Sequence, residues 1–533
     1  MKNHNMKIAI AFLIIELLVM GSFAQVFAQK EAINTLSITK DFACKQSIAA
    51  NQKHLYRIDL KQGEAIKASI DQLSVDVVID IYNSKSELLS SIDGSGKIEK
   101  IDFTAMQTGT FFLELYPYEK EGQSGEYSFV LAQKLNAKEN IRRMAKKEIP
   151  SQLLYNLWLD AQSNPNAVSD FLDKQAHRHV IESIEGNPVA SRVTYFYIPS
   201  KNTEYMMQSG GPDYMGLRFS QLGNTALFFA SHVVPNDAIF NYGFNEFKKY
   251  SYGAEDVFVS RSIEHVYDNS VIMPDAMIDP YAMKNPTVKK GSIKEFSIYS
   301  TFLNEERKVT VLLPENYNAH RAHKLLILFD GEEYGGNLER RAAVPTSIIL
   351  DNLHAAEKIE PTITLLVWHM GKRNKDLVRK TFGNFIAQEL IPWTRKNYAI
   401  GTTPADICVG GSSRGGYAAS FIAFNHSNSI GNVISQSGSY WITSNEKKNH
   451  WMYPTEQGKL ITAFKKSKKL PIRFYMNIGL YDAGASMLGM NREFRSILQA
   501  KGYNLTYEEF KGGHSYLNWK QTLSAGILAI FGK

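Results

Sequence analysis

The sequence contains little cysteine, no low-complexity segment and no strong charge of either sign. Only two of its 533 residues are cysteines, Cys44 and Cys408. They fall in segments that we assign to different domains, which excludes a disulfide framework. Cys408 lies in an apolar run, as is typical of a buried thiol in a strand. Histidines form no rich ligand cluster, so we expect no metal and no cofactor.

The net charge excludes another class of function. The value of +7 comes from 60 basic and 53 acidic residues, which are spread along the whole chain. The densest basic run, "KKSKK" at residues 465–469, is typical of a solvated helix end. Because the sequence contains no zinc finger, recognition helix or arginine-rich arm, we expect no nucleic-acid partner. With 44% hydrophobic and 12% aromatic residues, the chain is expected to form several globular domains.

The first residues have the pattern of a secretory signal. Two lysines precede an apolar segment, residues 8–23, and Val26 and Ala28 supply the small residues that signal peptidase prefers. Glu16 interrupts the apolar segment, and a carboxylate in the middle of a membrane span is costly. We therefore predict a signal peptide over residues 1–28, a periplasmic or secreted protein, and no membrane anchor after cleavage.

The first part of the mature chain has the pattern of antiparallel strands. Residues 33–135 contain alternating runs such as "HLYRIDL" and "FFLELY", separated by glycines at turns, which predicts a β-sandwich accessory domain. Residues 136–176 have helical spacing and are expected to form a connector. Residues 177–277 return to strand-like runs and predict a second β-sandwich. The two β regions contain no catalytic constellation.

The pattern changes again over residues 287–533. Near-continuous apolar runs, such as "KLLILFD" and "TITLLVWH", alternate with helical segments. Such runs are typical of a mostly parallel sheet covered on both faces, and proteins of this class place their chemistry at the carboxyl ends of the strands. The functional residues are therefore expected in this region.

A candidate nucleophile follows one of these strands. Residues 411–415, "GSSRG", fit the pattern G-x-S-x-G between the strand "ICV" and a helix rich in small residues. In such a nucleophile elbow the serine lies in a sharp, strained turn, and glycines two positions before and after it avoid collisions. The register makes Ser413 the nucleophile and Ser412 a bystander. The alternative is a merely flexible connection.

A serine needs a base, and the base needs an orienting carboxylate. His514 in "KGGHSYLNW" directly follows the last predicted strand, whereas His426 and His450 are expected on the surface. Asp482 in "IGLYDAGAS" follows the penultimate strand and is the preferred carboxylate, with Glu493 as its competitor.

The oxyanion of the tetrahedral intermediate needs backbone donors. We expect them from the amides of Arg414, which follows the nucleophile, and Glu332, which lies in the loop "LLILFDGEEYGG". Gly331 would allow this loop to turn closely under the site. Asp330 and Glu333 make the loop acidic, and we favour a solvated loop over a metal site.

These motifs resemble the enterochelin (enterobactin) esterase family, within the wider esterase D group. The segments "LLILFDGEEY", "ELIPWTRKNYAI", "GGSSRGGYAAS" and "GGHSYLNW" occur in the family's order over residues 279–533. Residues 174–252 are similar to that family's N-terminal domain. The earlier strands, from "LYRIDLKQGE" to "GEYSFVL", resemble the bacterial pre-peptidase C-terminal domain. The expected architecture is two N-terminal β-sandwich modules followed by an α/β-hydrolase domain.

The resemblance also implies roles for residues. It makes Ser413 the nucleophile, His514 the base and Asp482 the acid, at a position where the family often has glutamate. Arg373 in "RNKDL" matches an arginine that the family carries as "R-x-x-E-L" beside the cleft, with Asp376 in place of the glutamate. Arg373 either binds an anionic substrate or pairs with Asp376, and we favour the pairing.

The implied activity is ester hydrolysis through an acyl-enzyme. The family name suggests a siderophore trilactone of the enterobactin type or a related ester as substrate. The same scaffold also serves feruloyl and acetyl esterases that act on plant polysaccharide side chains. The expected partner is thus a small-molecule or oligosaccharide ester. A non-catalytic binding protein on a hydrolase scaffold is the alternative from a different class.

Overall fold

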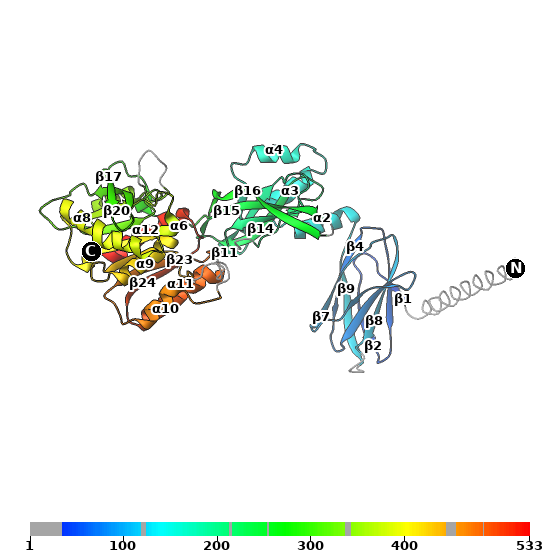
Figure 1. The fold of residues 1–533 in the computed structure, drawn as a ribbon. Coiled ribbons are helices and arrows are strands. Elements are labelled where there is room, and N and C mark those ends of the chain that lie inside the picture. Colours follow the sequence, from blue (N-terminus) through cyan, green and yellow to red (C-terminus); the bar gives the residue numbers. More distant parts are fainter. Residues whose placement is uncertain are drawn as a thin grey trace, which may run out of the picture. The chain divides into compact units, whose positions relative to one another are not determined.

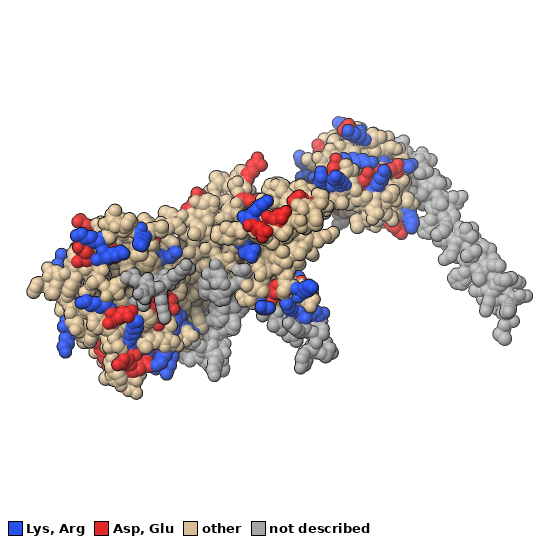
Figure 2. Space-filling view, turned by 90° about the horizontal axis from the view of Figure 1, so that it is seen from above, with Lys and Arg blue, Asp and Glu red and all other residues tan. Residues whose placement is uncertain are grey.

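The structure is a computed structural model, and its chain divides into two compact units, Met1–Pro150 and Ser151–Lys533 (Figure 1). The residues that it describes are 35–118, 124–212, 216–252, 255–335, 343–443, 455–482 and 484–533. The predicted signal peptide lies outside these ranges. Within them, no helix is both long and apolar enough to cross a membrane. Figure 2 shows basic and acidic side chains interspersed on the face in view, as expected from the spread of charge along the sequence.

The first unit is built from strands. They are β1 (Thr35–Ser37), β2 (Ala43–Ile48), β3 (His54–Leu60), β4 (Ala65–Asp71), β5 (Val77–Asn83), β6 (Leu88–Ile92), β7 (Ile98–Thr104), β8 (Gly109–Pro117) and β9 (Gly125–Leu135). They form a five-stranded sheet, β1-β3-β8-β5-β6, and a four-stranded sheet, β2-β9-β4-β7. The predicted β-rich region is therefore confirmed.

The alternation of residue types explains the core of this unit. In strands such as β3 and β4, one from each sheet, alternate residues are apolar, so one face of each sheet contributes to a single core. Tyr56 and Ile79 come from one sheet, and Ile66 and Phe129 come from the other, and all four are fully buried. Cys44 and Cys408 are free thiols.

The helical segment predicted as a connector is divided between the two units. Helix α2 (Ala137–Glu148) begins at Asn136 with a capping box and packs on the first unit, where Asn140 donates to the Gly63 carbonyl at 3.0 Å. Helices α3 (Gln152–Asp160) and α4 (Ala167–Asp173) belong to the second unit.

Strands follow α4 in the second unit. They are β10 (His179–Ile184), β11 (Asn187–Tyr197), β12 (Tyr205–Gly210), β13 (Ser220–Gln221), β14 (Phe228–Pro235), β15 (Ile239–Tyr252) and β16 (Glu255–Ile272). They form two sheets, β10-β11-β14-β13 and β12-β15-β16, which share one core around Tyr195 and Phe240. We refer to this part, residues 179–272, as the β domain.

The rest of the second unit contains an eight-stranded sheet. Its strands are β17 (Ser292–Ser300), β18 (Glu305–Leu313), β19 (Lys324–Phe329), β20 (Thr362–Val367), β21 (Ile407–Ser412), β22 (Asn432–Gln436), β23 (Arg473–Gly479) and β24 (Asn504–Phe510). The order is β17-β18-β20-β19-β21-β22-β23-β24. The strands β17 and β18 pair antiparallel, and all pairs from β20 to β24 are parallel. The expected α/β region is thus present, with a mixed and mostly parallel sheet.

Helices and helical turns connect these strands. They are η1 (Pro280–Ala282), α5 (Thr346–Ala355), α6 (Arg373–Asp376), α7 (Lys380–Asn384), η2 (Phe385–Leu390), α8 (Ile391–Asn397), η3 (Pro404–Asp406), α9 (Arg414–Asn425), α10 (Lys459–Lys466), η4 (Ala485–Gly489), α11 (Met490–Ala500) and α12 (Tyr516–Phe531).

The sheet is covered on both faces. Along β19, Leu325 and Ile327 belong to a core with residues of α9 and α10, whereas Leu326 and Leu328 belong to a second core with residues of α5 and α12. Because alternate side chains point to opposite faces, a strand buried on both must be apolar throughout. This explains the near-continuous apolar runs of the sequence.

Candidate active site

Ser413 lies in a strained turn between β21 and α9. Its backbone angles are φ 57° and ψ −120°, a conformation that residues with a side chain rarely adopt. The turn is held because the Ser413 amide donates to the Gln436 carbonyl at 2.9 Å and the Ser413 carbonyl accepts from the Tyr417 amide at 3.1 Å. The motif therefore forms a nucleophile elbow and not a flexible connection.

The two glycines of the motif are required by close packing. A Cβ atom on Gly411 would lie 3.0 Å from backbone atoms of Gly415, so the strand and the helix could not approach so closely. A Cβ atom on Gly415 would lie 3.3 Å from a carboxylate oxygen of Asp330. The spacing of G-x-S-x-G thus follows from how tightly the chain passes itself on both sides of the serine.

The structure brings His514 to the serine. His514 lies in the loop between β24 and α12, and its Nε2 atom is 2.9 Å from Ser413 Oγ. The Trp519 ring packs edge-on against the imidazole, with the two centroids 4.9 Å apart. The His514 side chain is 25% exposed, so it is held in place and still reaches solvent.

Asp482 completes a continuous hydrogen-bonded chain. It follows β23, its side chain is buried, and its Oδ2 atom lies 2.9 Å from His514 Nδ1. The competing carboxylate, Glu493 on α11, accepts instead from the Gln457 side chain. His426 follows α9 and is partly buried, not on the surface as expected, while His450 lies outside the described residues.

The turn after β19 lies beside these hydrogen-bonded side chains. A Cβ atom on Gly331 would lie 2.9 Å from backbone carbon of Leu366 in β20, so only glycine allows this approach. The Glu332 carboxylate accepts from the amides of His369 and Met370 at 3.1 and 2.9 Å, which fixes the turn against the end of β20. Arg414 begins α9, so both predicted oxyanion donors occupy the expected loop and helix start.

The pairing predicted for Arg373 is wrong. Arg373 does not pair with Asp376 but forms two bonds to Asp330, from Nε at 2.8 Å and from a terminal nitrogen at 2.7 Å. The same terminal nitrogen donates to the Ser412 carbonyl at 3.1 Å. Asp376 pairs instead with Arg307, at 2.6 Å, and with Arg379.

Asp330 also differs from the expectation. It is only 1% exposed, so the acidic loop is not simply solvated. Burial acts to lower the pKa of Arg373, but the charge of Asp330 outweighs this and raises that pKa above its ordinary value. Burial raises the pKa of Asp330, and the Arg373 guanidinium acts in the opposite direction. Together the two groups fasten the turn after β19 to the strand that carries the serine.

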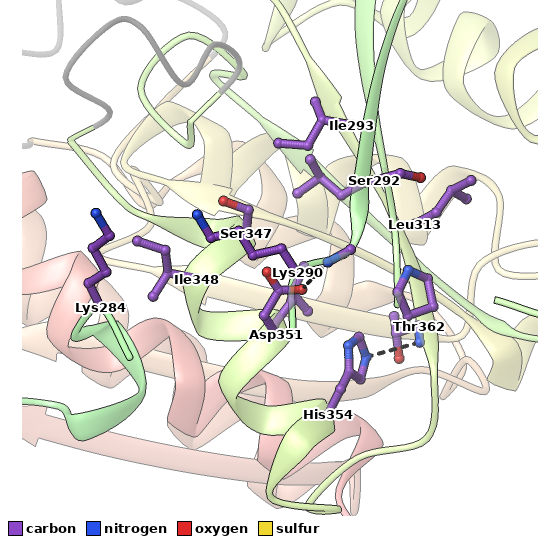
Figure 3. Close-up of a pocket in the computed structure, with 14 residues that line it drawn as sticks. Lys284, Lys290, Ser292, Ile293, Leu313, Ser347, Ile348, Asp351, His354 and Thr362 are labelled. Atoms are coloured by element: carbon purple, nitrogen blue, oxygen red, sulfur yellow. Dashed lines mark hydrogen bonds between the residues drawn. The ribbon is translucent and has the colours of Figure 1, made fainter. Parts of the chain in front are cut away.

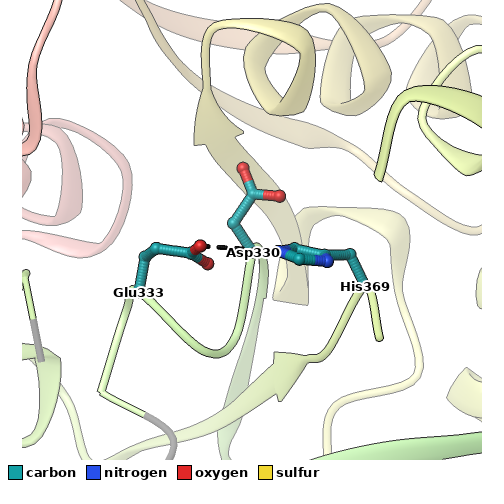
Figure 4. Close-up of side chains that lie close together, drawn as sticks. All are labelled: Asp330, Glu333 and His369. Atoms are coloured by element: carbon teal, nitrogen blue, oxygen red, sulfur yellow. Dashed lines mark hydrogen bonds and ion pairs between the residues drawn. The ribbon is translucent and has the colours of Figure 1, made fainter. Parts of the chain in front are cut away.

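A cluster of possible metal ligands adjoins this ion pair. Ligand atoms of Asp330, Glu333 and His369 all lie within 4.8 Å of one another, and Figure 4 shows Glu333 and His369 pointing toward each other. However, both Asp330 oxygens accept from Arg373, whose guanidinium repels a cation. The hydrogen bond to Glu333 raises the pKa of His369, against the lowering effect of burial. We assign no metal to this cluster.

A cavity lies away from this site. It has a volume of about 600 Å³ and is lined by residues of β17, β18 and α5 (Figure 3). Thr362, the first residue of β20, lines it, whereas His369 follows the other end of that strand. Burial lowers the pKa of His354 to about 4, so this lining histidine is neutral and accepts from the Thr362 amide at 3.2 Å. The cavity thus lies at the amino-terminal ends of the parallel strands, whereas Ser413 lies at their carboxyl ends.

Comparison with protein families agrees with this arrangement. Residues 300–530 match the family model described as "Putative esterase". This match spans the sheet from β18 to β24 and covers less than half of the chain. Residues 52–117 match the bacterial pre-peptidase C-terminal domain, so both resemblances predicted from the sequence are confirmed.

Individual relatives of this chain are distant. It is 23% identical over 257 residues to the uncharacterized protein YjcH of Bacillus subtilis, covering 45% of this chain and 97% of that protein. It is 23% identical over 236 residues to the iron(III) enterobactin esterase of Dickeya dadantii, covering 42% of this chain and 52% of that enzyme. The chain thus spans about half the length of the Dickeya enzyme.

A solved structure shares the fold. The enterochelin esterase of Shigella flexneri superimposes with a TM-score of 0.54 at 17% identity, covering 68% of this chain and 97% of the other. At this identity the similarity establishes the fold alone.

Sequence reasoning missed two residues of the candidate site. His369 lies two residues after the end of β20, at the carboxyl ends of the parallel strands where the serine lies, and this position is the signal that could have found it. Asn518, four residues after His514, contacts the loop that carries the base. Its other partner, the Ile239 carbonyl, is distant in sequence, so no local pattern points to that contact.

Proposed function

We propose that the protein is a serine esterase that hydrolyses carboxylic esters through an acyl-enzyme. The observation that carries this proposal is the chain of two 2.9 Å contacts from Asp482 through His514 to Ser413. It stands at the carboxyl ends of the parallel strands, and the serine lies in the strained turn that this chemistry requires.

The geometry supports a two-step mechanism. Ser413 Oγ attacks the carbonyl carbon of the ester while His514 Nε2 takes the hydroxyl proton. The amides of Arg414 and Glu332 donate to the resulting oxyanion. His514 then returns the proton to the departing alcohol oxygen, which leaves the acyl group on Ser413. Water repeats the sequence, with its proton passing to His514, and releases the carboxylic acid.

Asp482 has a supporting part in this mechanism. Its carboxylate accepts from Nδ1 of His514, which keeps Nε2 without a hydrogen and directed at the serine. The same carboxylate stabilises the imidazolium that forms when the serine is deprotonated. Asp482 does not need to accept the proton itself.

We propose a siderophore trilactone of the enterobactin type, or a related ester, as the substrate. The names of the Dickeya dadantii and Escherichia coli relatives, both iron(III) enterobactin esterases, support this choice. An ester of a plant polysaccharide, carrying feruloyl or acetyl groups, is the alternative. The partner would in either case be a small-molecule or oligosaccharide ester.

Two measurements on the purified chain test the proposal. A fluorophosphonate probe should label the wild-type protein and a Ser412→Ala control, because Ser412 is the neighbouring serine and takes no part in the mechanism. Ser413→Ala should not be labelled. If a folded wild-type sample fails to label, the protein is a binding protein on a hydrolase scaffold and the esterase proposal is wrong.

The substrate is tested by relative rates. Hydrolysis of enterobactin, methyl ferulate and acetylated xylan should be compared at equal enzyme concentration. A kcat/KM for enterobactin well above the other two values supports the siderophore, and the reverse order supports the polysaccharide ester.

We also propose that the chain is exported and is not anchored in a membrane after cleavage. The apolar segment and the small residues Val26 and Ala28 support this. N-terminal sequencing of the mature protein should begin at Gln29, and a protein that retains Met1 in the cytosol would contradict export.

A further inference from the structure

The β domain contacts the loop that carries His514. Ile239, the first residue of β15, uses both of its backbone groups there. Its amide donates to the Lys511 carbonyl at 2.9 Å, and its carbonyl accepts from Asn518 Nδ2 at 2.7 Å. The residues involved are more than 270 positions apart in the sequence, so the contact joins two separate parts of the second unit.

Asn518 links this contact to both neighbours of the base. Its Oδ1 atom accepts from the Gly513 amide at 3.0 Å and from the Ser515 hydroxyl at 3.2 Å. Gly513 and Ser515 flank His514 directly. Asn518 is only 3% exposed, so water does not compete for these bonds. One amide side chain therefore holds the Gly513 backbone on one side of His514 and the Ser515 side chain on the other, and ties both to β15.

Close packing leaves this loop little freedom. A Cβ atom on Gly512 would lie 2.2 Å from Asn518 Nδ2 and 2.7 Å from the Ile239 carbonyl oxygen. The loop approaches β15 so closely that only glycine fits at this position. A salt bridge between Lys511 and Asp237, at 2.8 Å, adds a contact at the exposed rim.

The same edge of the β domain supports the loop that carries Asp482. Tyr481 precedes Asp482, its amide donates to the Gly512 carbonyl at 2.9 Å, and its ring packs edge-on against Phe240 with centroids 5.8 Å apart. The β domain thus contacts both loops that bring the base and the acid to Ser413.

We propose that Asn518 is a positioning residue for His514, and that it couples the base to strand β15 of the β domain. The proposal rests on the proposed function, because it assigns His514 the role of base. Its physical reason is that proton transfer requires Nε2 at hydrogen-bond distance from the serine oxygen, and small displacements of a catalytic group reduce rates strongly. The β domain is accordingly part of the catalytic unit and not a separate accessory.

Two substitutions separate the parts of this proposal. Asn518→Ala removes all three hydrogen bonds of the side chain. Asn518→Asp keeps an oxygen for Gly513 and Ser515 but places a second oxygen, without a hydrogen, against the Ile239 carbonyl. We expect both variants to lose about ten- to hundredfold in kcat on p-nitrophenyl acetate and in the rate of fluorophosphonate labelling, with KM within about twofold of wild type.

Asn432→Ala is the matched control. Asn432 is 5% exposed, and its Nδ2 atom donates to the Ala405 and Ile407 carbonyls at 3.0 and 3.2 Å. It is the first residue of β22, so it lies at the amino-terminal ends of the parallel strands, whereas Ser413 lies at their carboxyl ends. This variant should lower Tm as Asn518→Ala does but keep kcat within about twofold of wild type. Equal losses of kcat in both variants would show a general effect of stability and would overturn the proposal.

The other outcomes are equally decisive. Wild-type kcat in Asn518→Ala would overturn the positioning role, and wild-type kcat in Asn518→Asp would overturn the coupling to β15. Hydrogen exchange of residues 511–518, measured by mass spectrometry, should be faster in Asn518→Ala than in the control. This readout does not depend on activity. If the wild-type chain is folded but neither labels nor hydrolyses the ester, the proposed function fails, and the catalytic part of this proposal fails with it.

The exposed salt bridge provides a test that leaves the buried packing intact, in case the Asn518 variants do not fold. Asp237→Lys places two positive charges together and should slow labelling by about two- to threefold, because exposed pairs contribute little. Adding Lys511→Asp restores an opposite pair and should restore the rate. A double variant as slow as the single one would contradict the coupling.

Discussion

The candidate site contains two buried aspartates, Asp330 and Asp482. They differ in the basic side chain with which each one pairs. Asp330 directly follows β19 and is 1% exposed, while Asp482 lies three residues after β23 and is 4% exposed. Asp482 meets the imidazole of His514, and Asp330 meets the guanidinium of Arg373. Imidazole gains and loses a proton near neutral pH, whereas guanidinium stays charged. The Asp482–His514 pair can therefore take part in proton transfer, whereas the Asp330–Arg373 pair can only hold the backbone in place.

The contacts of His514 and Arg373 agree with this division of roles. His514 reaches the Ser413 hydroxyl, which is the group that would react. Arg373 reaches the Ser412 carbonyl, which belongs to the backbone just before the elbow. An aspartate thus supports the proposed catalysis after β23, and another aspartate holds the backbone in place after β19.

Removing the imidazole should have the largest effect. His514→Ala leaves Ser413 without a base, so we expect kcat on p-nitrophenyl acetate to fall by roughly 10⁵- to 10⁶-fold. Circular dichroism should be unchanged, because His514 is partly exposed. Residual labelling close to wild type would mean that another group activates the serine.

Changing the carboxylate beside the imidazole should cost less. Asp482→Asn keeps the shape but presents an amide to Nδ1, which favours the wrong tautomer of His514. We expect a loss in kcat of about 10³- to 10⁴-fold, with KM nearly unchanged. Glu493→Gln is the control, because that carboxylate contacts Gln457 and not the imidazole. A larger loss in the control would identify Glu493 as the acid.

The site's two sides also differed in how well the sequence predicted them. Ser413, His514 and Asp482 each follow a strand, and strand ends can be located from apolar runs and glycines. Arg373 follows β20 and its partner Asp330 follows β19, but the nearby Asp376 looked like the partner because it is three residues away. Asp376 is in fact enclosed by Arg307 and Arg379. Which of several nearby charges pair is decided by side-chain packing across the sheet, and periodicity carries no information about it.

The same limit applies to the β domain. Strand-like runs in the sequence predicted its strands. The contact of Ile239 with Asn518 depends on how two separately predicted parts dock, and Asn518 has no feature that marks it in the sequence. The helical segment 136–176 was likewise predicted as one connector, yet α2 packs on the first unit and α3 belongs to the second.

Breaking the ion pair should affect stability more than chemistry. Arg373→Met leaves the Asp330 carboxylate buried without its partner, and we expect the free energy of unfolding in urea to fall by about 3–5 kcal/mol. Replacing both groups, in Asp330→Leu with Arg373→Met, should recover most of this loss, because a buried pair contributes little beyond its own desolvation. Lys289→Met is the control. It breaks the exposed pair with Glu315 and should change stability by less than about 0.5 kcal/mol. If the double variant is as unstable as the single one, Arg373 acts through its bond to Ser412.

The smallest expected effect lies on the Arg373 side, where one titratable base is present. His369 Nε2 lies 3.4 Å from the Glu333 carboxylate, and this contact raises the pKa of His369 above its ordinary value of 6.5. A histidine with a raised pKa contributes stability fully below its unfolded pKa and loses that contribution as the pH rises through its folded pKa. Glu333→Gln should therefore destabilise the protein by less than about 1 kcal/mol at pH 5.5 and by nearly nothing at pH 9, since both side chains are partly exposed. In a His369→Gln background the same substitution should have no pH-dependent effect. A difference that stays constant from pH 5.5 to pH 9 would show that Glu333 acts through packing and not through the charge of His369.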